Sequence, residues 1–227
     1  MSMPANKRKN EHGNVSIYIL VAVALLASLS FAVSQSGRGN VQQLNAERAR
    51  LFGSEILEYA TNLGNAVTQL KLRGCDESEI NFDNPLATGY NNTGAPADNT
   101  CDVFHPSGGG LSWQSIPERA RNQTASYHPD YFINATNQVS GTKTNSGDLA
   151  IYAEINLEVC AAINTLIGLD PADPPNTDPT FHNNTAFKFT GSFAQPASLS
   201  AYPNEVVGCF LDGGNGFYYF YKVLISR

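Results

Sequence analysis

The sequence is short of charged residues, and this shortage excludes one class of partner. Charged residues make up 15% of the chain, against ~25% in a typical soluble domain, and the formal net charge is −6. Nucleic-acid-binding surfaces need clustered lysine and arginine, and no basic run follows the short cluster Lys7-Arg8-Lys9. We therefore expect no nucleic-acid partner.

The sequence also lacks the motifs of common catalytic centres. It has 4 histidines, no G-x-S-x-G nucleophile motif and no C-x-x-C pair. The run Gly108-Gly109-Gly110 lacks the lysine of a phosphate-binding loop, so it indicates a flexible turn. These absences predict that the chain is not an enzyme.

No cofactor is predicted either. Calcium is the one cation that the loops of this chain could hold, because calcium binds carboxylate and amide oxygens. Prolines and glycines explain the same loops without a metal, so the metal prediction is none. The weak calcium candidates are Asp170, Asp173, Asp178, Asp212 and Asn215.

Charge is absent from residues 14–36, which follow a basic leader, residues 1–13. Val15 to Val33 is almost wholly apolar, about the ~20 residues that cross a bilayer as a helix. Positive charge on the short N-terminal side indicates that this side is cytoplasmic. The pattern predicts a single-pass inner membrane protein, with the lipid bilayer as a partner, a cytoplasmic N-terminus and a periplasmic or extracellular C-terminal domain.

A second helical pattern follows over residues 37–74. No proline interrupts residues 14–73, so the apolar and amphipathic halves predict one long helix. Arg73 and Gly74 supply a cation in the last turn and a C′ glycine. Apolar residues recur mainly at steps of three and four, which gives one apolar face. That face comprises Val41, Leu44, Leu51, Ile56, Tyr59, Leu63, Val67 and Leu70.

The four cysteines predict two disulfides in an oxidising compartment. Their number is even and their spacings are wide, so three connectivities are open. We favour Cys75 with Cys101 and Cys160 with Cys209, because each pair closes a local loop.

The pattern of apolar runs and turn residues over 75–227 predicts an α+β head with a small antiparallel sheet and long loops. A hairpin is expected where residues 206–211 and 217–225 flank the glycine-rich turn 212–216. The aromatic last strand should lie centrally in the sheet. Further expected elements are strands at 111–113, 148–157 and 185–193, and a short helix at 158–169 that ends at Gly168.

The order of these segments resembles the type IV pilin and pseudopilin superfamily. The matching features are the leader that ends in Gly13 and the apolar helix that continues as an amphipathic one. The resemblance implies that a prepilin peptidase cuts between Gly13 and Asn14, and that the N-terminal helix bundles with other pilin-like subunits. The family usually carries Phe after the glycine and Glu four residues later, whereas this chain has Asn14 and Tyr18.

We therefore expect a membrane-anchored, pilin-like structural subunit, either a minor pilin or a pseudopilin of a secretion apparatus. Loops 83–110 and 170–184 are the expected contacts with a partner. One alternative is a signal-anchored periplasmic or cell-surface binding module that does not polymerise. Another is cleavage after Ala32 by signal peptidase, which releases a secreted protein. The leader could also remain uncut.

Overall fold

The computed structural model describes residues 15–123, 130–139, 146–172, 174, 176–177, 188–193, 197–199 and 205–227. Contacts divide the chain into two compact units, Met1–Asn45 and Ala46–Arg227. Helix α1 (Val15–Leu72) contributes residues to both units, and each unit is described by itself. Processing residues Gly13 and Asn14 lie outside the described residues.

In the first unit, α1 carries apolar side chains around its whole circumference. Every described side chain from 17 to 31 is exposed, and the large hydrophobic ones are between 51% (Val21) and 77% (Tyr18) exposed. The stretch contains no glycine, proline or charge, which suits a helix. We call residues 17–31 the exposed apolar stretch.

The predicted location is wrong. Among the described residues, no helix has both the length and the apolar character that crossing a bilayer requires. This finding contradicts a single-pass inner membrane protein with a cytoplasmic N-terminus. The disulfides described below are compatible with an extracellular location.

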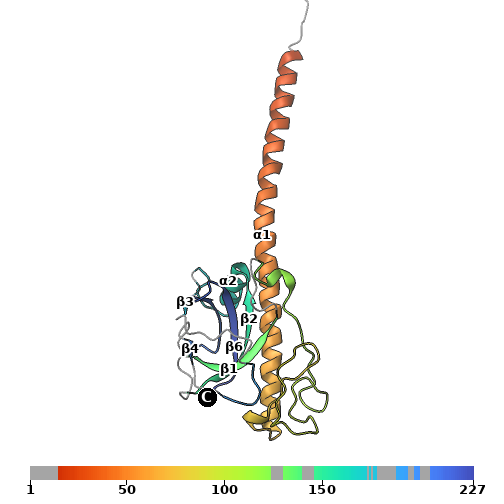
Figure 1. The fold of residues 1–227 in the computed structure, drawn as a ribbon. Helices are drawn as coiled ribbons and strands as arrows, with labels where there is room; N and C mark the ends of the chain where they lie inside the picture. Colours follow the sequence, from red (N-terminus) through yellow and green to blue (C-terminus); the bar gives the residue numbers. More distant parts are fainter. Residues whose placement is uncertain are drawn as a thin grey trace, which may run out of the picture. The chain divides into compact units, whose positions relative to one another are not determined.

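In the second unit, residues 46–72 of α1 bury one face against the head. Ile56, Leu63, Val67 and Leu70 are fully buried, as the helical spacing predicts, whereas Leu51 is 66% exposed. Figure 1 shows this part of α1 beside the sheet, and a side chain at Gly64 would touch Lys222 and Leu224 of strand β6. Burial of this face therefore joins the helix to the sheet.

The C-terminus of α1 forms a Schellman motif. Gly74 has φ +101°, the left-handed conformation that glycine adopts without strain. The Cys75 N–H donates to the Leu70 carbonyl at 3.1 Å, and the Gly74 N–H donates to the Lys71 carbonyl at 3.1 Å. The predicted C′ glycine is confirmed, and it places Cys75 directly beside the end of the helix.

The fold class is α+β, and four central strands form an antiparallel sheet, as predicted. The strand order is β3-β5-β6-β2-β1-β4, with β5, β6, β2 and β1 antiparallel in turn. The short strands β3 and β4 pair in parallel with β5 and β1. Strand bounds are β1 Phe132–Val139, β2 Asp148–Ile155, β3 Asn176–Thr177, β4 Ala197–Leu199, β5 Val207–Asp212 and β6 Tyr218–Ile225.

Two predicted strands of the head need revision, and one strand was missed. Residues 111–113 are not a strand, and residues 188–193 are also irregular, while 185–187 lie outside the described residues. Strand β1 was not predicted at all. The hairpin of β5 and β6 is confirmed, and aromatic β6 lies centrally between β5 and β2.

Helix α2 (Leu157–Leu166) covers the same face of the sheet as α1. The Asn156 side chain caps it by accepting the Val159 N–H at 3.0 Å. A Cβ at Gly53 of α1 would lie 3.1 Å from Ile163, so glycine lets the two helices approach closely. Two single-turn 3₁₀ helices, η1 (Glu77–Glu79) and η2 (Glu118–Ala120), complete the elements.

Both predicted disulfides are present with the favoured pairing. Cys75 bonds to Cys101 and Cys160 bonds to Cys209. The second bridge joins α2 to β5, where the Asn164 side chain reinforces it. The Asn164 amide donates to the Cys209 carbonyl at 3.0 Å and accepts the Cys209 N–H at 2.9 Å. The Asn164 amide therefore pairs the backbone N–H and carbonyl of Cys209 in β5, as a neighbouring strand would.

Candidate functional site

The calcium candidates that the structure describes lie in turns that they stabilise themselves. Oδ1 atoms of Asp170, Asp212 and Asn215 accept backbone N–H groups two residues on, at 2.8–2.9 Å. Asp173 and Asp178 lie outside the described residues. Within the described part, no three histidine, cysteine, aspartate or glutamate side chains gather where a metal could bind.

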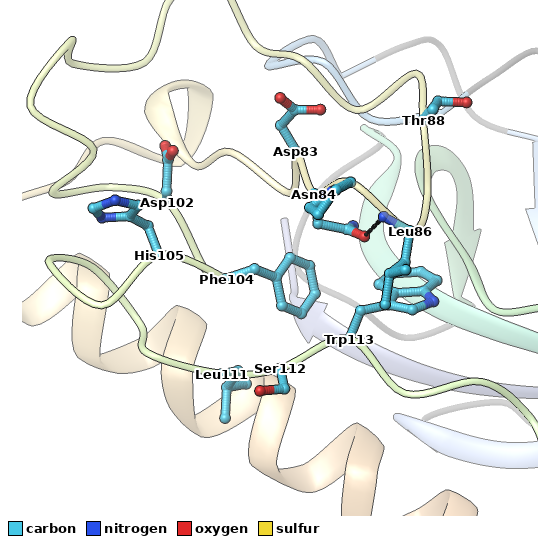
Figure 2. Close-up of a pocket in the computed structure, with 11 residues that line it drawn as sticks. Asp83, Asn84, Leu86, Thr88, Asp102, Phe104, His105, Leu111, Ser112 and Trp113 are labelled. Atoms are coloured by element: carbon cyan, nitrogen blue, oxygen red, sulfur yellow. Dashed lines mark hydrogen bonds between the residues drawn. The ribbon is translucent and has the colours of Figure 1, made fainter.

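A concave site lies in the loop between α1 and β1, within the second unit. A hollow of about 710 Å³ opens there, which we call the loop hollow. Its size falls in the ~300–1,000 Å³ range of small-ligand sites. Figure 2 shows its lining: Asp83, Asn84, Pro85, Leu86, Thr88, Asp102, Phe104, His105, Leu111, Ser112 and Trp113.

Hydrogen bonds from asparagine side chains fix the backbone around the loop hollow. Asn84 Oδ1 accepts the N–H groups of Leu86 (3.0 Å) and Ala87 (2.8 Å), which fixes the turn after Pro85. Asn81 Oδ1 accepts the Asn92 N–H at 3.1 Å, and Asn81 Nδ2 donates to Asp102 at 3.0 Å. The disulfide from Cys101 ties the same loop to α1, so the lining is preorganised by bonds within the chain.

The glycine run beside the loop hollow forms a turn, as predicted, and two of its glycines, Gly108 and Gly109, are tightly packed. A Cβ at Gly108 would lie 2.0 Å from the Asp102 carbonyl oxygen, and one at Gly109 would lie 2.5 Å from the Val103 carbonyl oxygen. Only glycine permits such an approach of two backbones. The Gly109 N–H donates to the Asp102 backbone carbonyl at 2.9 Å, so the run fixes the segment that carries the Asp102 side chain.

Aromatic side chains form the floor. Phe104 packs edge-to-face on Trp113 at 5.5 Å between ring centroids, and Trp113 contacts Tyr90 at 6.1 Å. The Tyr90 hydroxyl accepts the Ile133 N–H at 3.0 Å, and burial raises the Tyr90 pKa far above its ordinary value. The Trp113 indole donates to Asp130 at 3.2 Å. The floor is therefore a layer of aromatic rings packed on one another.

Three polar side chains of the lining keep unused hydrogen-bonding atoms. Among the described residues, no donor reaches the Asp83 carboxylate or Oδ2 of Asp102, whose Oδ1 accepts from Asn81. His105 Nδ1 accepts the Ser107 N–H at 3.2 Å, and among the described residues Nε2 has no partner. The described lining contains two carboxylates and no lysine or arginine. The loop hollow is therefore acidic, and in Figure 2 Asp102 lies at one end of it.

Comparison with known proteins gives no relative. We found no match to this chain among protein-family models, curated proteins or solved structures.

One signal in the sequence points to the loop hollow. Phe104, His105 and Trp113 stand out as aromatic side chains within a long, otherwise polar loop. The loop itself was predicted to contact a partner, although its acidic members, Asp83 and Asp102, were not singled out. Their convergence depends on the disulfide and on the asparagine bonds, which spacing does not reveal.

Proposed function

We propose that this protein is a pilin-like structural subunit that assembles through the exposed apolar stretch of α1. One observation carries the proposal, namely that every described side chain from 17 to 31 is exposed although the stretch is apolar on all sides. A helix that is hydrophobic all round is normally buried. Helices of neighbouring subunits would provide that cover.

The free energy of burial favours a contact that covers the helix on several sides. Burying one large hydrophobic side chain contributes ~1.5–3 kcal/mol. Ten such side chains lie in the stretch, and they point in every direction around the helix. A single flat partner would cover only one side, whereas a bundle of parallel helices would cover all of them.

The proposed subunit has a head carried by the same helix. Residues 46–72 pack on the sheet, and the exposed apolar stretch stays available for assembly. Cleavage between Gly13 and Asn14 by a prepilin peptidase belongs to this proposal. Because Asn14 and Tyr18 replace the usual Phe and Glu of the family, a minor or divergent subunit fits better than a major one.

The test is assembly of the full chain with one charge placed in the stretch. Ala24→Arg should abolish assembly, because an unpaired guanidinium buried among apolar helices is strongly unfavourable. Leu51→Arg is the matched control, since Leu51 is 66% exposed on the same helix but lies in the second unit. Sedimentation velocity and electron microscopy measure the outcome, and circular dichroism confirms that both variants fold.

A second candidate function is a binding module that does not polymerise. The loop hollow favours it, because the hollow is preorganised and carries unused polar atoms. A full chain that stays monomeric at all concentrations, with Ala24→Arg indistinguishable from the parent, would support this candidate and contradict the first.

A further inference from the structure

We propose that the loop hollow binds an arginine side chain presented by a partner polypeptide. The hollow joins an acidic end to an aromatic floor. In the view of Figure 2, Phe104 lies between Asp102 and His105 on one side and Leu86 and Trp113 on the other. An arginine side chain has the matching order, an apolar stem that ends in a planar cation.

The acidic end needs a donor that the chain does not supply. Asp102 is only 9% exposed, and Asn81 satisfies one of its two carboxylate oxygens. The other oxygen has no donor among the described residues, and Asp102 belongs to the lining of the hollow. A largely buried carboxylate is stabilised by a charged donor, which forms shorter and stronger hydrogen bonds than a neutral one. Asp83 adds a second negative charge to the lining.

Two cations of the head contact the surroundings of the loop hollow and already have partners within the chain. Lys188 Nζ donates to the Thr88 carbonyl and lies 5.0 Å from the centre of the Tyr90 ring. Arg73 donates to the Gly108 carbonyl at 2.8 Å. Neither residue belongs to the lining. The negative charge of the hollow is therefore available to a cation from another polypeptide.

The aromatic floor favours arginine over lysine. Guanidinium is planar, stacks on aromatic faces and is less strongly hydrated than ammonium, so it loses less on entering a partly closed site. Phe104 is half-buried and presents the most accessible ring of the floor. A hollow of about 710 Å³ also has room for the residues that flank the arginine in a peptide.

The chain contains a built-in reporter for this site. Trp113 is the single tryptophan of the sequence and lines the hollow, so its indole N–H resonance and its fluorescence report on occupancy. The full chain is titrated with acetyl-Gly-Arg-Gly-amide and with the same peptide carrying citrulline, the neutral isostere of arginine. A lysine peptide and a neutral methyl glycoside complete the series.

We expect the arginine peptide to shift the Trp113 signals, with lysine weaker and citrulline at least about tenfold weaker, because the charge is lost. Asp102→Asn should weaken arginine binding by about tenfold, since the amide oxygen can still accept from Asn81 while the charge is gone. Asp170→Asn is the matched control, because Asp170 is an exposed turn aspartate outside the hollow. Binding should also weaken as salt is raised.

Equal binding of the citrulline peptide, or shifts produced only by the glycoside, would overturn the proposal, and so would the absence of any shift. Phe104→Leu provides a second variant that keeps the floor apolar but removes the ring, and it should weaken arginine more than lysine. The Ala24→Arg chain should bind the peptide normally. Failure of assembly and failure of binding are therefore separate outcomes.

Discussion

Two stretches of helix α1 carry similar leucines, but those of one stretch are buried and those of the other are exposed. Leu63 is fully buried against the head, whereas Leu26 is 65% exposed. The difference lies in how apolar residues are distributed around the helix. From 46 to 72 they follow one face, which the sheet of the same chain can cover. From 17 to 31 they cover all faces, and one intramolecular surface could not bury them.

This comparison separates what stabilises the head from what is available for assembly. Core packing and disulfides belong to the second unit, and changes there should alter the free energy of unfolding. Changes in the exposed apolar stretch should leave that free energy unchanged and should alter self-association.

Removing the Cys160–Cys209 bridge should give the largest effect. The bridge closes a sequence separation of 49 residues, and loss of loop entropy in the unfolded chain predicts about 4 kcal/mol of destabilisation for Cys160→Ala with Cys209→Ala. Urea unfolding followed by tyrosine and tryptophan signals measures it. The pair Cys75→Ala and Cys101→Ala, with a separation of 26, should cost slightly less, about 3.5 kcal/mol. A loss below about 1 kcal/mol for either pair would contradict the assignment of both bridges as stabilising.

Leu63→Ala should destabilise the head by about 2–5 kcal/mol, because it opens a cavity in a fully buried part of the core. Leu51→Ala, on an exposed face of the same helix, should change the free energy of unfolding by less than about 0.5 kcal/mol. Denaturant midpoints of the two variants provide the measurement. Similar midpoints would show that residues 46–72 do not contribute to the core as described.

The buried tyrosines should make the head sensitive to alkali. Burial raises the pKa of Tyr59 to about 12, and it raises the pKa values of Tyr90, Tyr131 and Tyr152 further. Tyrosine in the unfolded chain titrates near ~10, so the unfolded state loses its protons first and stability falls as pH rises above that value. Each buried tyrosine should cost about 1 kcal/mol between pH 10 and 11.

Tyr131→Phe isolates one such group, because the Tyr131 hydroxyl makes no hydrogen bond with the described residues. Between pH 10 and 11, the free energy of unfolding of the variant should fall by about 1 kcal/mol less than that of the parent. Unfolding midpoints of the variant and the parent measured at both pH values decide the outcome, and identical slopes for the two proteins would refute the explanation.

The sequence predicted those features that depend on neighbouring residues. The helical face around Leu63, the C′ glycine Gly74, the β5–β6 hairpin and the two disulfide pairs each follow from spacing or turn chemistry. Strand β1 was missed because its sequence is rich in asparagine and threonine. Asn134 and Thr136 are buried there, where tertiary contacts override their low hydrophobicity.

The loop hollow was beyond sequence reasoning for a different reason. Its lining combines residues from 83–88, 102–105 and 111–113, which meet only after the Cys75–Cys101 bridge and the asparagine bonds have formed. The glycine run, predicted as a turn, also provides close backbone contact with Asp102. Such convergence is a property of the folded loop and leaves no periodic signal in the sequence.

Photo-crosslinking from position 26 shows whether the exposed apolar stretch contacts a second copy of the chain. A benzophenone amino acid replaces Leu26 in the full chain, and mass spectrometry identifies the residues to which it attaches. If the subunits assemble through the exposed apolar stretch, crosslinks should join residues 17–31 of two different chains. Crosslinks confined to residues 46–227 of the same chain would show that the apolar stretch is core of its own molecule, and would contradict the account.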